Sequence, residues 1–141
     1  MNNLLREFDD RRVWSLESRE VTGLYLDYRF TIDIWWGEKD LTESSVSIQI
    51  GNRFLLRRGG KYFEVNPEQI DTVAPALSIL HQPVDSLMAY RDGRLIIRMN
   101  CGDQIVVEKD SRYESWETHG TGRLAGIGML CSPHPGSPWG S

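Results

Sequence analysis

One stretch in which apolar and polar side chains alternate constrains the fold more than any other feature of the sequence. In TGLYLDYRFTIDIWW, residues 22–36, the alternate apolar positions are Leu24, Leu26, Tyr28, Phe30, Ile32 and Ile34. Successive side chains of a strand point to opposite faces of a sheet. The stretch therefore predicts a half-buried strand, or two strands joined by a tight bend at residues 27–29.

Further strands are predicted on both sides of this stretch, separated by turn signals. SSVSIQI repeats the alternation, and Gly51-Asn52 and Gly59-Gly60 mark turns, so residues 12–66 predict an antiparallel meander. Three short strands are expected around 87–90, 95–99 and 104–108, and YESWETHG and GIGMLCS predict a last hairpin.

A helix is predicted between the two groups of strands, around residues 67–80. Asn66 is a suitable cap, Pro67 suits the first helical position, and Pro75 should kink or split the helix. VWSL at 13–16 and VDSL at 84–87 suggest pseudo-repeats, 12–66 and 84–131, joined by this helix. The predicted fold is α+β and mostly β, with antiparallel meanders and one central helix in a single domain, 1–141.

Composition narrows the function classes. A chain of 141 residues with 40% hydrophobic residues fits one globular domain. A net charge of −4 argues against nucleic acid as the principal partner. No apolar run is long enough to span a bilayer and no secretory signal is visible, so a cytoplasmic protein without a membrane partner is expected. Two cysteines and three histidines without zinc spacing predict no metal and no cofactor.

Motifs in the second half carry a resemblance to a known family. They are Asp92-Gly93, Leu95, Tyr113-Glu114-x-Trp116, Cys131, Pro135-Gly136 and Trp139. With them the chain resembles a family of small uncharacterised bacterial proteins, a domain of unknown function with a Y-E-x-W motif and a C-x-P-G…W ending. The resemblance implies a compact β-rich fold and, by analogy with small proteins near toxin genes, an immunity or partner-binding role. Relative to the pattern, residues 35–45 resemble an insertion.

The Y-E-x-W motif has two interpretations. Glu114 beside Trp116 suggests a general acid whose pKa is raised by an apolar ring. Alternatively, Tyr113, Glu114, Trp116 and the terminal Trp139 are structural, and Trp116 locks the sheet closed. No second carboxylate stands at a suitable spacing and no catalytic triad motif is present, so we favour the structural interpretation and predict no enzymatic activity.

Residues 35–45, WWGEKDLTESS, form the sharper candidate for a functional site. Adjacent strand residues face opposite ways, so one tryptophan is expected to leave the core beside acidic residues. Tryptophan is enriched in interface hot spots, and an acidic rim attracts a basic partner. The predicted contact residues are Trp35, Trp36, Glu38, Asp40 and Glu43.

These residues favour a non-enzymatic protein-binding protein, an immunity protein that neutralises a co-encoded bacterial toxin by occluding its active site. The expected partner is a basic protein, a toxin domain. The alternative is a small-ligand or RNA-binding module that uses the basic hairpin 53–63 and the glycine loop 120–126. An enzyme that uses Glu114 ranks third.

Overall fold

Two antiparallel β-sheets packed face to face make up most of the described chain. The computed structural model describes residues 4–37, 43–51, 53–110, 112 and 114–139. Sheet A contains, in spatial order, β1 (Leu5–Glu7), β2 (Arg11–Glu20), β8 (Pro83–Tyr90), β9 (Leu95–Met99), β10 (Gln104–Val107), β6 (Phe54–Arg58) and β7 (Lys61–Val65). Sheet B contains β12 (Met129–Cys131), β11 (Trp116–Thr121), β5 (Glu43–Ile50), β4 (Phe30–Gly37) and β3 (Gly23–Leu26). The predicted class, α+β and mostly β, is confirmed.

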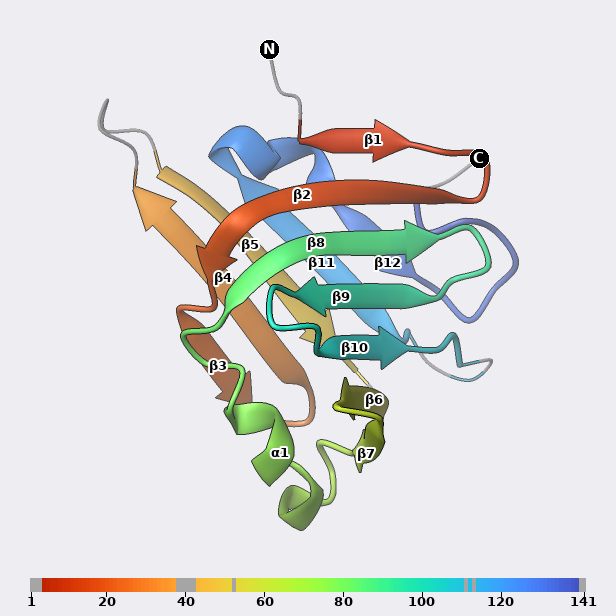
Figure 1. Cartoon of the computed structure of the whole chain (residues 1–141). Coiled ribbons are helices and arrows are strands. Elements are labelled where there is room, and N and C mark those ends of the chain that lie inside the picture. Colours follow the sequence, from red (N-terminus) through yellow and green to blue (C-terminus); the bar gives the residue numbers. More distant parts are fainter. Residues whose placement is uncertain (1–3, 38–42, 52, 111, 113, 140–141) are drawn as a thin grey trace.

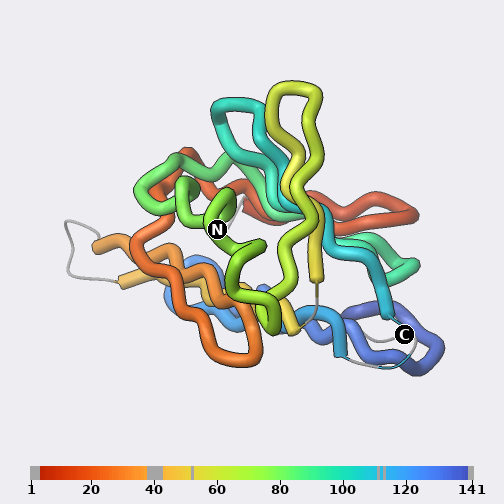
Figure 2. Tube along the Cα trace, turned by 90° about the horizontal axis from the view of Figure 1, so that it is seen from below, coloured from red at the N-terminus to blue at the C-terminus, as the bar shows by residue number. Residues whose placement is uncertain are grey.

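The two layers are visible in both overall views. Figure 1 looks onto sheet A with sheet B behind it, and Figure 2 shows the layers from below. Their inner faces supply the core: Phe30 of sheet B packs against Phe54 of sheet A, with ring centroids 5.3 Å apart. Interleaved aliphatic side chains fill the rest, because each sheet must cover its apolar face with the other.

The alternating stretch forms two strands rather than one. β3 and β4 pair as an antiparallel hairpin, with Leu26 opposite Phe30. Asp27 closes the bend, since its carboxylate accepts the backbone N–H of Arg29 at 2.7 Å. The second of the two predicted arrangements is therefore correct, with the bend where the sequence indicated it.

Glycines at positive φ make the predicted hairpin turns. Gly59 and Gly60, at φ +56° and +79°, join β6 to β7 in the conformation that a tight two-residue hairpin requires. Gly93, at φ +100°, follows Asp92 between β8 and β9. The predicted short strands correspond to β8, β9 and β10, and the predicted last hairpin to β11 and β12.

A bulge bends β2, which pairs with β8 of sheet A on both sides of it. The register with β8 shifts between Ser15 and Arg19, and Glu17 and Ser18 have φ of +50° and +61°. Both strained residues accept hydrogen bonds from distant segments, Glu17 from Arg123 and Ser18 from Asn100, each at 2.8 Å. In Figure 1 the strand curves at this point toward sheet B. The bulge thus lets one strand follow both layers.

The segment 67–80 is helical in two short pieces, η1 (Ile70–Thr72) and α1 (Ala74–Leu77). Pro75 lies in the first turn of α1, where its missing N–H is tolerated, so the helix restarts there instead of running through. The Thr72 hydroxyl donates to backbone carbonyls of Asn66 and Gln69, which holds the preceding turn in a non-helical form. The expected split at Pro75 is therefore present.

The region 12–66 is not one meander in one sheet. Only β3, β4 and β5 form a meander. β2 pairs with β8, and β6 and β7 return to sheet A beside β10. The chain moves between layers because a single sheet of these strands would leave one apolar face in water. The segments 12–66 and 84–131 distribute their strands differently between the sheets, and their relation as pseudo-repeats stays a prediction for superposition to test.

Candidate protein-binding site

The tandem tryptophans lie on opposite faces of β4. Trp36 points into the core and is 6% exposed, and the Arg19 guanidinium lies 5.1 Å from its ring centre. Trp35 lies on the outer face of sheet B and is 50% exposed. Of the two tryptophans among the predicted contact residues, only Trp35 is exposed. The prediction for Trp36 is corrected, because the strand alternation that exposes one indole buries the other.

The surroundings of Trp35 form a mixed aromatic and polar surface. The outer face of β3, β4 and β5, which we call the tryptophan face, comprises Tyr25, Asp33, Trp35, Glu43, Ser45 and Ser47. Ser45 lies directly opposite Trp35 in the register, and Ser47 opposite Asp33. Tyr25 is 64% exposed. A hollow of about 340 Å³ lies between the two aromatic side chains and is lined by most of this face.

Two hydrogen bonds between the Thr22 side chain and the backbone of β4 lie beside the hollow. Thr22, in the connection between β2 and β3, donates its hydroxyl proton to the Asp33 carbonyl at 3.2 Å. The same hydroxyl accepts the Trp35 backbone N–H, also at 3.2 Å. These contacts fix the strand edge on which Trp35 stands, so the exposed indole is presented by a regular strand.

Of the three acidic residues predicted as contact residues, the structure describes Glu43. Glu43 is exposed at the start of β5, opposite Gly37. Glu38 and Asp40 lie outside the described residues. Asp33 adds a carboxylate that the sequence analysis did not select, although its position two residues before Trp35 puts both side chains on one strand face.

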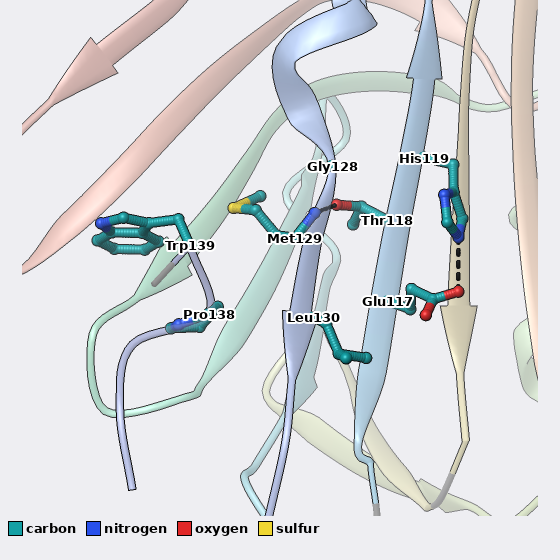
Figure 3. Close-up of a pocket in the computed structure, with 8 residues that line it drawn as sticks. All are labelled: Glu117, Thr118, His119, Gly128, Met129, Leu130, Pro138 and Trp139. Carbon is teal, nitrogen blue, oxygen red and sulfur yellow. Dashed lines mark hydrogen bonds and ion pairs between the residues drawn. The ribbon is translucent and has the colours of Figure 1, made fainter. Parts of the chain in front are cut away.

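A second hollow lies farther along sheet B, around β11 and β12 (Figure 3). Its volume is about 330 Å³, and Glu117, His119, Leu130 and Trp139 are among its lining residues. His119 Nε2 lies 2.5 Å from Glu117 Oε1, and Figure 3 shows the two side chains pointing toward one another. Glu114 is not one of the lining residues. The carboxylate–imidazole pair is a surface contact, with His119 61% exposed, and lies on an open face of the sheet.

Trp116 connects the two sheets. Its side chain is 1% exposed, and its indole N–H donates to the Gly93 carbonyl at 2.8 Å. A side chain at Gly93 would lie 2.8 Å from Lys109 Cδ and 3.0 Å from Cys131 Sγ, so this turn must pack against β12 without a Cβ. Three segments that carry the motifs noted in the sequence thus meet at one structural contact. Glu114 is exposed, and Tyr113 lies outside the described residues.

Trp139 and Cys131, two further residues of these motifs, are also packed, whereas Asp92, Pro135 and Gly136 are exposed. Trp139 is half-buried and packs against the core, with the guanidinium carbons of Arg12 and Arg91 at 4.8 and 5.3 Å from its ring centre. Burial raises the pKa of the Cys131 thiol above its ordinary value, although the nearby Lys109 ammonium opposes that shift. A neutral buried thiol at this position is structural.

Part of each alternative site makes internal contacts, although Arg57 and Lys61 form no ion pair among the described residues. In the basic hairpin 53–63, Arg53 pairs with Glu64 at 3.3 Å and Arg58 with Asp103 at 2.7 Å. The glycine loop 120–126 belongs largely to η2 (Gly122–Ile127), which packs on β5 and β11. Within the described ranges, no group of three metal-binding side chains comes together and no helix is long and apolar enough to cross a membrane.

Comparison with known proteins places the chain in a family. A family of unknown function, DUF6188, matches residues 13–136, which is most of the chain, so the protein belongs to that family. Neither a search of curated proteins nor a search of solved structures found a match. The match spans both sheets and every segment that meets at Trp116, and it ends before Trp139.

Proposed function

We propose that the chain is a protein-binding protein without catalytic activity of its own, and that it binds a basic protein partner through the tryptophan face. The observation that carries the proposal is Trp35, whose indole is 50% exposed on a regular strand. Tyr25 stands beside the same hollow. Large aromatic side chains that become buried on association contribute most of the energy at protein interfaces.

Charge supports the choice of a basic partner. Asp33 and Glu43 lie on the tryptophan face, and Glu117 lies on the next strand of the same outer surface. Carboxylates at the edge of an interface speed association with a cationic partner and disfavour an anionic one. Nucleic acid would be repelled from this side of the molecule.

We further propose that the partner is a bacterial toxin in the cytoplasm and that the chain occludes its active-site cleft, as an immunity protein does. This step rests on the analogy with small proteins encoded beside toxins. Occlusion needs a rigid apolar anchor to enter a cleft and a charged rim to match its surroundings, and Trp35 with Glu43 supplies both. The RNA-binding alternative is less favoured, since Arg53 and Arg58 already pair with acidic side chains.

Co-expression of the chain with the product of the adjacent reading frame tests the proposal. We expect a one-to-one complex that Trp35→Ala weakens by about 2 kcal/mol or more, or about 30-fold in Kd. Ile70→Ala is the control, because Ile70 is 74% exposed and belongs to η1, outside the tryptophan face. The proposal fails if both variants bind equally well, or if a variant lacking residues 35–45 gives full protection against the toxin.

A further inference from the structure

The outer face of sheet A carries a continuous apolar row. Five aliphatic or thioether side chains lie directly opposite one another across five strands: Val13, Met88, Ile96, Val106 and Leu55. All are half-buried, and Figure 1 shows β2, β8, β9 and β10 with no described element in front of them, whereas the β6–β7 hairpin is turned out of their plane (Figure 2). With strands about 4.8 Å apart, the row is about 19 Å long.

Arginine and tyrosine side chains flank the row on both sides. On one side, Arg11 lies opposite Tyr90, and the Arg94 guanidinium carbon lies 4.1 Å from the Tyr90 ring centre. On the other side, Arg98 lies opposite Gln104, which in turn lies opposite Arg57. We call the apolar row together with Arg11, Arg57, Arg94, Arg98, Tyr62 and Tyr90 the arginine face.

The cations of this face differ in how they are paired: Arg11 forms an ion pair with Asp10 at 2.8 Å, and others form none in the part of the chain that the structure describes. Among the described residues, neither Arg94 nor Arg98 forms an ion pair. Arg94 Nε is buried and has no hydrogen-bond partner there. Arg57 is held over Tyr62, 5.3 Å from the ring centre, and donates to Gln104 rather than to a carboxylate. A planar guanidinium stacked on a ring still has donors that can bind a carboxylate in two places.

We propose that the arginine face is a second interface and that it binds an acidic amphipathic helix of a partner protein. An apolar row about 19 Å long, followed along the strand pairings, corresponds to the length of about 13 helical residues at 1.5 Å per residue. Carboxylates on both flanks of such a helix would meet Arg94 on one side, where Arg11 is already paired with Asp10, and Arg57 and Arg98 on the other. Arginine, tyrosine and methionine are the residue types enriched at protein interfaces.

The composition of the face favours this occupant over two others. Single-stranded nucleic acid is held by stacking its bases on open aromatic rings. Here the centre of the face is aliphatic, and the Tyr90 ring is covered by Arg94. A second copy related by a two-fold axis would bring arginine against arginine, which costs free energy. This interface lies on the opposite sheet from the tryptophan face, so the two proposals can fail separately.

The test uses the full chain and two designed peptides. Each peptide forms a helix with one leucine face; glutamates flank that face in the first peptide and lysines in the second. Fluorescence anisotropy should show at least tenfold tighter binding of the glutamate peptide, weakened by salt. Arg98→Glu and Ile96→Ser should each weaken that binding about tenfold. Lys61→Glu is the control, since it makes the same charge change at the exposed β6–β7 turn.

Three results would overturn the proposal: equal affinity for the two peptides, equal effects of Arg98→Glu and Lys61→Glu, or tighter binding of a single-stranded thymidine oligonucleotide that depends on Arg98. Sedimentation of the chain alone gives a further check, because self-association that Ile96→Ser abolishes would assign the face to a second copy. Trp35→Ala should leave peptide binding unchanged, which separates this interface from the proposed binding of a basic partner.

Discussion

The two outer faces of the sandwich are built on the same strand alternation, yet they carry opposite chemistry. The arginine face has an apolar row flanked by Arg94, Arg98 and their neighbours. The tryptophan face has serines and carboxylates around Trp35 and Tyr25. Their inner faces are alike, since both are lined by buried aliphatic side chains. The inner faces therefore explain why the chain folds, and the difference between the outer faces is the basis of the two proposed interfaces.

The comparison also shows what net charge conceals. A formal charge of −4 describes the whole chain and predicts repulsion from any anionic partner. Segregation of the charges onto two sheets gives each face its own local field, and fields between exposed charges fade within about 10 Å at 0.1 M salt. One small protein can thus present a cation-binding and an anion-binding surface at once.

The largest effect is expected from breaking the contact between Trp116 and Gly93, which joins the two sheets. Trp116→Ala should lower the free energy of unfolding by about 3–5 kcal/mol, because it leaves a cavity between the sheets and removes the hydrogen bond to Gly93. Urea denaturation measures the change. Binding at both faces should weaken together as the folded fraction falls.

Trp116→Phe is the matched variant. It retains an aromatic ring in the same space and loses the N–H donor, so it should be less destabilising than the alanine variant. A loss below about 1 kcal/mol for Trp116→Ala would contradict the role of this residue as the connection between the sheets.

The tandem tryptophans sharpen the distinction between inner and outer faces. Trp36→Ala should destabilise the fold by about 3 kcal/mol, since the ring is buried and Arg19 packs on it. Trp35→Ala should change stability by no more than about 0.5 kcal/mol, as is usual for surface positions. Thermal or urea unfolding of the two variants side by side gives the comparison, and equal losses would contradict the assignment of Trp35 to the surface.

The sequence predicted the fold well because alternation and turn glycines are local signals. Residues 22–36, Gly59-Gly60 and Asp92-Gly93 each specify a hairpin without reference to the rest of the chain. Local signals do not specify which strands become neighbours across the sandwich. The pairing of β2 with β8 depends on a bulge at Glu17 and Ser18, residues that carry no turn signature, so the sequence suggested a simple meander instead.

The candidate surfaces were predicted less completely. The even-numbered apolar residues through Ile34 already put Trp36 on the core side of the strand and Trp35 on the other, but the alternation was not extended to this pair, so both were named as contact residues. The arginine face was missed because its members come from β2, β6, β8, β9 and β10. A partial signal was present in RLIIRM, where Arg94, Ile96 and Arg98 alternate with buried residues on one strand.

The smallest predicted effect is electrostatic and separates the two faces by rate. Glu43→Gln should slow association of the basic partner about two- to threefold at about 0.1 M salt and leave dissociation nearly unchanged, because a rim carboxylate acts mainly before contact. Neutralising Glu38 and Asp40 as well should enlarge the effect. Arg57→Gln, which removes a positive charge on the opposite sheet, should not slow this association. Stopped-flow tryptophan fluorescence, to which the exposed Trp35 contributes, supplies the signal. At about 1 M salt the difference between Glu43→Gln and the unmodified chain should vanish. Slowing that persists at high salt would mean that Glu43 makes a direct contact in the complex, and the tryptophan face would then bind its partner through a central carboxylate rather than a charged rim.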